Sequence, residues 1–258
     1  MQNRFFKAAG SIAVIALAVT AAGCSMDMDI GSSDGVPLAE LDQSGDAPTE
    51  LALASGDTVI ITTGETLSID VEGDAEDVAK MRFSLEGGML GIARESGNWS
   101  GGTATTVRVT MPAPTEIDMA GSGNITSDAL AAAAEINIAG SGDVEVSGID
   151  SQRLEISIAG SGGFAGTGET DVLEVALMGS GSANMPALKA DNADISIAGS
   201  GSANFASDGT VEASIAGSGS VNVTGNASCN LNAMGSGSLN CKPGTSAPSD
   251  DGTSADSE

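Results

Sequence analysis

A glycine-rich triplet recurs through the second half of the chain and limits what the chain can fold into. Gly-Ser-Gly occurs seven times between residues 121 and 237, at steps of 19, 20, 19, 20, 18 and 18 residues. A nearly constant period of this size is typical of a solenoid, in which each unit buries its apolar face only against its neighbours. The period is too short for a pair of helices in each unit. We therefore expect one turn of a solenoid for each triplet.

The residues on both sides of each triplet alternate between apolar and polar. Ile136 and Ile138 precede one triplet and Val144 and Val146 follow it, with polar residues between them. Such alternation, carried by β-branched residues, predicts strands with one buried face. Glycine at each bend has no side chain to collide with the next turn. The sequence therefore predicts an all-β fold, a parallel β-helix or β-solenoid with about seven rungs and an aliphatic interior.

Composition narrows the functional classes. The chain has 258 residues, of which 41% are hydrophobic but only 2% aromatic, so its core must be aliphatic and narrow. The formal net charge of -26 disfavours nucleic acid as a partner, because its phosphates carry the same sign. The chain has no histidine, the commonest general base and metal ligand, and nothing to activate the triplet serines. We expect neither an enzyme nor a cofactor.

Residues 1–23 have the features of a bacterial export signal. Arg4 and Lys7 precede an apolar run, residues 8–22, which is short for a membrane span. The segment that ends in Gly23 and Cys24 resembles the lipobox of bacterial lipoproteins, in which the cysteine is lipidated. The resemblance implies attachment to a membrane through a lipid on Cys24, and Ser25 at the next position resembles lipoproteins sent to the outer membrane. The alternative is simple secretion, with Cys24 incidental.

The segments outside the repeats differ from them in composition. Residues 24–52 and 242–258 are rich in Asp, Ser, Gly and Pro without sustained periodicity, which predicts a flexible acidic tether and a disordered acidic tail. Alternating runs at 58–62, 66–71, 81–85, 89–93 and 105–111 predict less regular strands. An uncovered solenoid end would offer bare backbone to other chains, so we expect these strands to cover the first rung. The β-solenoid domain is thus expected over residues 53–241.

These segments together resemble a known family. The sequence GGMLGIAR (Gly87–Arg94) is followed by VRVTMPAPTEIDMAGSGNI (Val107–Ile125) and then by repeated IxIAGSGxVxV units. This succession is similar to the head GIN domain family of putative auto-transporter adhesins, and the similarity extends over Asp57–Cys241. The resemblance implies a β-solenoid in the cell envelope and an adhesion role, and it brings no catalytic motif.

Alignment of the rungs places an acid five residues before every triplet except the last. The neighbours of each acid alternate with it and face inward, so the carboxylates are expected to point outward in one column. The acids are Glu116, Glu135, Glu155, Glu174, Asp194 and Glu212, and Asn230 takes the seventh position. Charges stacked about 4.8 Å apart repel by roughly 0.9 kcal/mol per adjacent pair in water.

Two interpretations of this acid column are open. It is either a ladder that weakly binds divalent cations or a basic partner surface, or a solvated face that keeps sheets from sticking together. The second is favoured, since charge on exposed strands usually has that role, and no metal site is certain.

Two further sets of residues follow the same register. Asn184, Asn204, Asn222 and Asn240 lie three residues after their triplets, and we expect a hydrogen-bonded amide ladder rather than a sugar-binding strip, because no aromatic platform accompanies them. Cys229 and Cys241 are expected to face inward on opposite sides of the last bend. In an oxidising envelope this predicts a disulfide, with two buried free thiols as the alternative.

The sequence therefore favours a non-enzymatic, lipid-anchored cell-envelope protein. It would display a rigid acidic β-solenoid for adhesion or envelope interaction, with an envelope, cell-surface or glycan partner. The alternative is a periplasmic binding or sensor module for divalent cations or glycans. Both a periplasmic and a surface-facing orientation are open.

Overall fold

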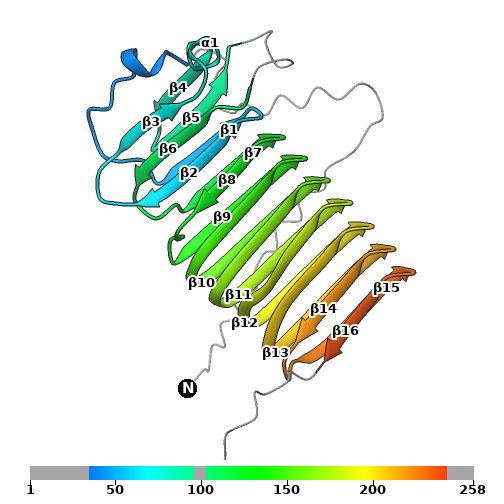
Figure 1. The fold of residues 1–258 in the computed structure, drawn as a ribbon. Coiled ribbons are helices and arrows are strands. Elements are labelled where there is room, and N and C mark those ends of the chain that lie inside the picture. Colours follow the sequence, from blue (N-terminus) through cyan, green and yellow to red (C-terminus); the bar gives the residue numbers. More distant parts are fainter. Residues whose placement is uncertain (1–34, 96–102, 243–258) are drawn as a thin grey trace, which may run out of the picture.

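The computed structural model describes residues 35–95 and 103–242, which form a β-solenoid of about seven turns (Figure 1). All 16 strands belong to one sheet that winds around the core. The elements in chain order are η1 (Leu38–Glu40), β1 (Glu50–Ala54), β2 (Thr58–Thr63), β3 (Ser68–Glu72), α1 (Ala75–Val78), β4 (Met81–Glu86), β5 (Met89–Arg94), β6 (Thr106–Met111), β7 (Glu116–Gly121), β8 (Asn124–Ser127), β9 (Ala133–Gly140), β10 (Asp143–Gly160), β11 (Gly163–Gly179), β12 (Ser182–Gly199), β13 (Ser202–Gly217), β14 (Ser220–Thr224), β15 (Ser228–Gly235) and β16 (Ser238–Lys242). The predicted fold class is confirmed.

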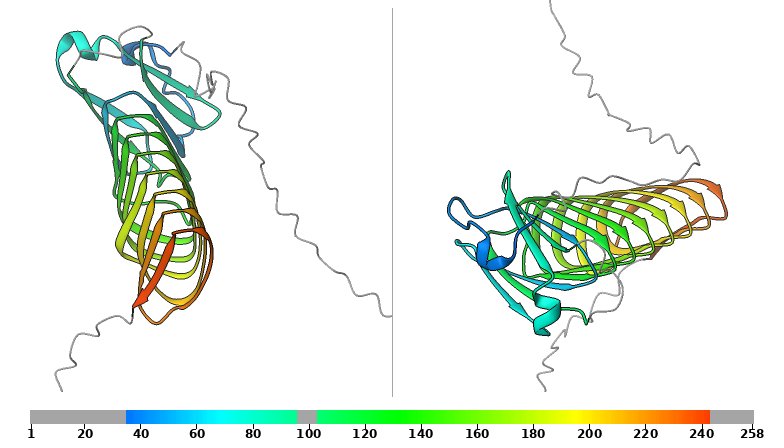
Figure 2. Two further views of the ribbon diagram at one scale, coloured as in Figure 1. Left: turned by 90° about the vertical axis from the view of Figure 1, so that its right-hand side faces the viewer. Right: turned by 90° about the horizontal axis from the view of Figure 1, so that it is seen from above.

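Successive turns lie on one another in parallel register. β10 runs from one triplet to the next, and β11 pairs with it along its length apart from a register shift between Val146 and Ile149, so that Glu155 lies beside Glu174 and Gly160 beside Gly179. The same parallel pairing joins β11 to β12 and β12 to β13. Figure 2 shows the result, a straight rod of stacked coils. Residues about nineteen positions apart therefore occupy equivalent places, as the repeat predicts.

The first glycine of each triplet is required by the geometry of the bend. Gly160 has φ +129°, and a Cβ at this position would collide with the carbonyl oxygen of Gly140 in the neighbouring turn. That oxygen accepts a hydrogen bond of 2.8 Å from the backbone N–H of Ser161. Only glycine combines this backbone conformation with so close an approach of two chains.

The interior is built from the predicted alternating residues. Ile136, Ile138, Val144 and Val146 are each at most 2% exposed. Phe164 and Phe205 are also fully buried, so the narrow core has aromatic side chains on β11 and β13. Burial of this continuous stripe is the main force that holds the turns together.

The amino-terminal end of the rod is assembled out of chain order. β1 lies between β5 and β7 and is parallel to both, while β2 pairs with β6 and β8. β3 and β4 then pair antiparallel with β6 and β5. The predicted covering strands are thus present, but β1/β2 and β5/β6 are themselves layers of the rod, and only β3 and β4 cover its end.

The predicted tether is wrong for residues 35–52, which belong to the folded part. Val36 pairs with Phe83 of β4, Leu38 packs against the core, and Leu51 is fully buried in β1. The partners of β1 come from residues 89–93 and 116–119, and pairing at such distances leaves no periodic signal in one short segment. Residues 24–34 of the expected tether and 243–258 of the expected tail lie outside the described residues.

Candidate functional site

The acid column forms one outward-facing stripe along the rod. Glu135 of β9 lies between Glu116 and Glu155, and the same register continues through Glu174, Asp194 and Glu212 to Asn230. Glu50 of β1 lies beside Glu116 and extends the column to seven acids. The repeat could not reveal Glu50, because β1 reaches its place through the out-of-order topology and not through the triplet period.

Charge is most crowded where Glu50 enters the column. Partial burial raises the pKa of Glu116, and the charges of Asp118, Glu135 and Glu50 raise it further. Burial also raises the pKa of Asp118; a hydrogen bond of 3.1 Å from Asn137 opposes this shift, and the charges of Glu135 and Glu50 add to it. Like-charge repulsion in the folded state is therefore concentrated at this part of the column.

The middle of the column is partly neutralised by one arginine. Arg153 Nη2 lies 2.7 Å from Glu174 Oε2 and 3.6 Å from Glu155 Oε2. Across residues 35–95 and 103–242, no three acidic or cysteine side chains gather closely enough to hold a metal ion. The column thus has the geometry of a solvated acidic stripe, and binding of divalent cations to it stays a prediction.

Beside the acid column, the same face of the rod is nearly flat. The outward position that follows each strand's last inward residue is filled by Ala120, Ala139, Ala159, Met178, Ala198, Ala216 and Met234. Met178 and Met234 are 52% and 76% exposed, and between them lies a shallow hollow of about 400 Å³ floored by alanine and serine. Small side chains allow another surface to approach this part of the sheet closely.

The opposite face carries the predicted amide ladder. Asn204 donates to Asn184 at 3.4 Å, Asn222 to Asn204 at 2.8 Å, and Asn240 to Asn222 at 3.2 Å. Each side-chain amide both donates and accepts, so the chain of bonds can run from turn to turn. The expected ladder is confirmed, and it links the last four turns of the rod.

A buried ion pair, which the sequence analysis did not identify, closes the amino-terminal end of the core. Ser55, Gly56 and Asp57 form the bend between β1 and β2, so Asp57 takes the place of a triplet's last glycine. Arg94 Nε donates to Asp57 Oδ2 at 2.8 Å, and Arg94 Nη2 bonds the other carboxylate oxygen. Asp57 is fully buried and the Arg94 side chain is only 9% exposed.

Neutral donors complete the shell around this carboxylate. Thr105 donates its backbone N–H at 2.8 Å and its hydroxyl at 2.7 Å, and Ser55 Oγ donates at 2.7 Å. Burial raises the pKa of Asp57, but the hydrogen bonds from Arg94, Thr105 and Ser55 outweigh it and lower the pKa to about 2. Both carboxylate oxygens are fully hydrogen-bonded. Asp57 therefore has the properties of a structural residue that joins the β1/β2 layer to the β5/β6 layer, and not those of a catalytic group.

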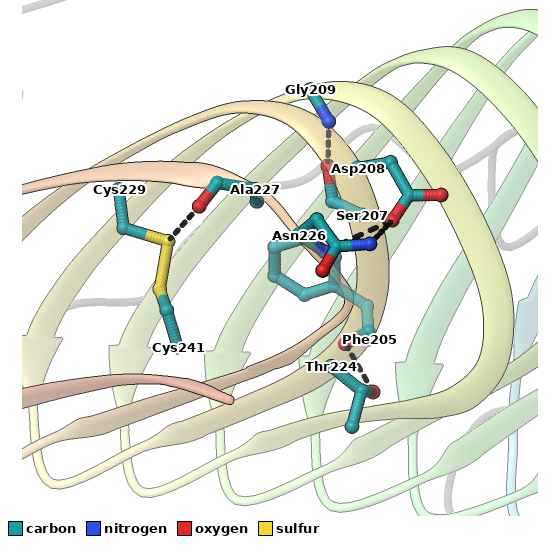
Figure 3. Close-up of a disulfide and its surroundings, with 9 residues drawn as sticks. All are labelled: Phe205, Ser207, Asp208, Gly209, Thr224, Asn226, Ala227, Cys229 and Cys241. Carbon is teal, nitrogen blue, oxygen red and sulfur yellow. Dashed lines mark hydrogen bonds between the residues drawn. A yellow bond between two sulfur atoms is a disulfide. The ribbon is translucent and has the colours of Figure 1, made fainter. Parts of the chain in front are cut away.

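The last turn is cross-linked. Figure 3 shows Cys229 of β15 joined to Cys241 of β16 by a disulfide with a Cα–Cα distance of 6.7 Å. The two cysteines lie on opposite sides of the last bend, as predicted, since Cys229 pairs with Val211 before the bend and Cys241 with Val223 after it. The expected burial is wrong, because Cys229 is half-buried and Cys241 is exposed: among the described residues no further turn lies on top of them.

The lipidation site expected at Cys24 lies outside the described residues. Among those described, no helix is long and apolar enough to cross a membrane. The described surface presents carboxylates, amides and small side chains, and the chain has no histidine. The small side chains allow another macromolecular surface to approach closely, and the carboxylates repel surfaces that are also negatively charged.

The fold is shared with several solved structures of bacterial proteins. A putative adhesin from Bacteroides fragilis matches with a TM-score of 0.69 at 17% identity, covering 76% of this chain and 93% of that one. A putative adhesin from Parabacteroides merdae matches with a TM-score of 0.63 at 19% identity, covering 77% and 93%. A putative lipid binding protein from Parabacteroides distasonis matches with a TM-score of 0.59 at 24% identity, covering 76% and 93%. At these identities the likeness establishes the fold alone.

A comparison with curated proteins finds no match. The family model of the putative auto-transporter adhesin, head GIN domain, matches residues 47–227. This range begins just before β1 and ends just before β15, so it covers six of the seven Gly-Ser-Gly bends, the acids of the column and the out-of-order amino-terminal layers. The chain therefore belongs to the family of putative auto-transporter adhesins with a head GIN domain.

Proposed function

We propose that this protein is a lipid-anchored adhesion module of the bacterial cell envelope, which acts as a rigid spacer and contact surface and not as an enzyme. The observation that carries the proposal is where the described chain enters the rod. Val36 pairs with Phe83 of β4, at the end covered by β3 and β4. The last strands, β15 and β16, are at the opposite end (Figure 1).

Attachment at Cys24 would hold the rod by its covered end. Gly35 is eleven positions after Cys24, and even fully extended these eleven steps span at most about 40 Å at roughly 3.6 Å per residue. A parallel stack rises about 4.8 Å per layer, so the layers of this rod extend over a comparable length. The last turn would then be at the end of the rod opposite the attachment, and the acid column and the flat face would run along the length between the two ends.

The membrane anchor is tested by fractionation of cells that express the full chain. We expect wild-type protein in the membrane fraction with incorporated labelled fatty acid, and the Cys24→Ala variant without label and outside that fraction. Ser25→Ala is the matched control and should behave as wild type. Membrane association and labelling that survive Cys24→Ala would refute the anchor.

Surface display is tested by adding a protease to intact cells. Digestion of the chain, while a periplasmic marker stays intact, supports adhesion at the cell surface. Protection in intact cells together with digestion after the outer membrane is permeabilised would instead favour the periplasmic module.

The adhesion role needs a functional assay. A strain that lacks this gene is expected to adhere less to surfaces and to other cells, and wild-type protein should restore adherence while Cys24→Ala should not. Unchanged adherence of the deletion strain in all assays would contradict the proposed role, even if the anchor is correct.

A further inference from the structure

The two ends of the rod are finished differently. At the amino-terminal end, β3 and β4 pair antiparallel with β6 and β5 and cover the core. At the other end, within the part of the chain that the structure describes, β15 pairs only with β13 and β16 only with β14. The outer edges of β15 and β16 therefore present backbone N–H and C=O groups available for a further strand.

Apolar side chains are exposed at this open end. Ala213 and Ile215 of β13 are each 2% exposed, while Leu231, the counterpart of Ala213 in β15, is 39% exposed. Leu239 of β16 is only half-buried, whereas its counterpart Val221 is fully buried. One more layer on this end would bury these side chains as every earlier layer is buried.

Negative charge is missing from this end alone. Residues 115–212 contain 15 acidic residues, but residues 213–242 contain none, and the acid column ends in Asn230. Solvent-exposed edge strands are usually protected by charge, and here the single charge on residues 213–242 is that of Lys242. The chain has a net charge of -26, so two copies repel each other over most of their surface. A neutral apolar edge is a surface through which they can associate with little repulsion.

Residues 243–258 lack the composition of a covering strand. Residues 243–258 contain no Val, Ile, Leu, Met or Phe, and four of them are acidic. A covering strand needs an apolar face to fill the end of the core. Residues 243–258 do not offer such a face, whereas the exposed end of a second copy does.

We propose that the open end is a self-association surface, at which β15 and β16 of two copies meet end to end about a two-fold axis. The exposed amides of Asn230, Asn232 and Asn240 suit such an isologous contact, because an amide donates and accepts and is complementary to itself. In such a dimer, the acids of the column that lie nearest to the contact are the two Glu212 residues, one from each copy. They would be separated by three strand spacings, roughly 14 Å. This exceeds the Debye length of about 8 Å at physiological salt, so repulsion between the rods is largely screened at the contact.

The disulfide gives this surface a fixed shape. Cys229 and Cys241 tie β15 to β16 across the end of the core (Figure 3). An edge of two strands held in one layer loses less conformational freedom on association than two free strands. The covered end of each copy, where the chain enters, is then at the outer end of a doubled rod.

Sedimentation velocity over a concentration series tests the proposal on the chain from Ser25 to Glu258, produced in an oxidising compartment. We expect a reversible dimer. Asn232→Asp should raise its dissociation constant at least about tenfold, since it places a new charge on each side of the contact. Ser196→Asp is the matched control, because Ser196, Ser214 and Asn232 occupy the same outward column on successive turns. It should leave the dissociation constant unchanged.

Three outcomes would overturn the proposal. The first is a wild-type chain that stays monomeric at every attainable concentration. The second is equal weakening by Asn232→Asp and Ser196→Asp, which would show a general charge effect. The third is a dimer that forms only when the chain is cut after Lys242, which would assign residues 243–258 as the cover. Thermal unfolding of both variants checks that each is folded as stably as wild type.

Discussion

Burial raises the pKa of the Asp57 carboxyl, and its hydrogen bonds lower it. The residue sits in a bend where the repeated turns have glycine, and its ion pair with Arg94 joins the β1/β2 layer to the β5/β6 layer. All its partners come from residues 55, 94 and 105, so three separate segments meet on two oxygen atoms. A buried pair of this kind is costly to break, because the remaining guanidinium is shielded from solvent and keeps only a more distant counter-ion, Asp77, at 3.5 Å.

Replacement of the carboxylate is the direct test of this ion pair. Asp57→Asn removes the closer of the two carboxylates beside the buried Arg94 and leaves only Asp77, whose Oδ1 lies 3.5 Å from Arg94 Nη1. We expect a loss of about 3 kcal/mol in the free energy of unfolding, the lower end of the range for a broken buried pair. Urea denaturation measures it. Asp150→Asn, at an exposed acid on β10, is the control and should change stability by no more than about 0.5 kcal/mol. Similar values for the two variants would show that the ion pair does not stabilise the fold.

The pH dependence of stability should have two parts with opposite signs. Because the pKa of Asp57 is lowered from 3.8 to about 2, its contribution of about 2 kcal/mol is complete above pH 3.8 and is lost as pH falls toward 2. The pKa values of Glu116 and Asp118 are raised, so their protonation favours the folded state and stability should rise as pH falls from 7 toward their folded pKa values.

Denaturation midpoints between pH 7 and pH 2 measure this profile. Glu116→Gln should raise stability at pH 7 and reduce the rise on acidification, while leaving the loss below pH 3.8 unchanged. A Glu116→Gln profile that coincides with that of the wild type between pH 7 and pH 3.8 would contradict the crowding of charge at Glu116.

At the scale of the element, glycine is required in the bend but not at the first position of the strand that follows it. Gly160 opens a triplet with positive φ and faces backbone. Gly163 begins β11 at a position that Ser182, Ser202, Ser220 and Ser238 fill in later turns, and a Cβ there would meet only the movable side chain of Asp143 and of Ser182.

Alanine substitution at these two glycines distinguishes the effect of a positive φ from the effect of adding a methyl group. Gly160→Ala should destabilise the protein by about 1–3 kcal/mol or more, because it combines an unfavourable backbone conformation with a clash against Gly140. Gly163→Ala should be close to neutral, and both are compared by denaturant unfolding. If Gly163→Ala costs as much as Gly160→Ala, the positive φ is not the cause.

The disulfide acts on one element of a nearly one-dimensional structure. The double variant Cys229→Ser/Cys241→Ser releases a closed loop of 13 residues, which weakens the last turn by about 3 kcal/mol in the chain-entropy model. Because each turn contacts only its neighbours, amide exchange should accelerate in β15 and β16 and stay unchanged in β10. Uniform acceleration along the whole rod would show instead that the turns unfold as one unit.

For the whole molecule, the distribution of charge matters more than its sum. The chain stacks carboxylates on adjacent strands and keeps one stretch, residues 213–242, free of acids. Adjacent carboxylates at about 4.8 Å repel by roughly 0.9 kcal/mol in water, and burial strengthens the repulsion while salt weakens it. Repulsion between the carboxylates of the acid column therefore destabilises the folded rod.

Added salt should weaken this repulsion. Between roughly 0.01 M and 0.15 M salt the Debye length falls from about 30 Å to about 8 Å, and the thermal midpoint should rise. Glu135→Gln, which removes a central charge but keeps an acceptor for Asn137, should raise the midpoint at low salt and reduce the salt dependence. A midpoint that is independent of salt in the wild type would mean that the stripe is already neutralised.

The repeated part of the fold could be predicted from the sequence alone because its contacts are periodic. Residues such as Ile136 and Ile156 meet at a fixed separation, so one register explains the core, the acid column, the Asn204–Asn222 ladder and the pairing of the two cysteines with Val211 and Val223. The triplet glycines are visible in the same way, since each performs the same task in each turn.

Only the tertiary structure determined the two ends. β1 enters between β5 and β7, Glu50 joins the column, and Asp57 finds Arg94 through pairings that occur once and so leave no periodic trace. The exposure of Leu231 and Cys241 depends on what lies beyond the last turn, which is a property of the stack and not of the turn's own sequence. Local alternation specifies which side of a strand faces inward, whereas burial at an end is decided by the layer that covers it.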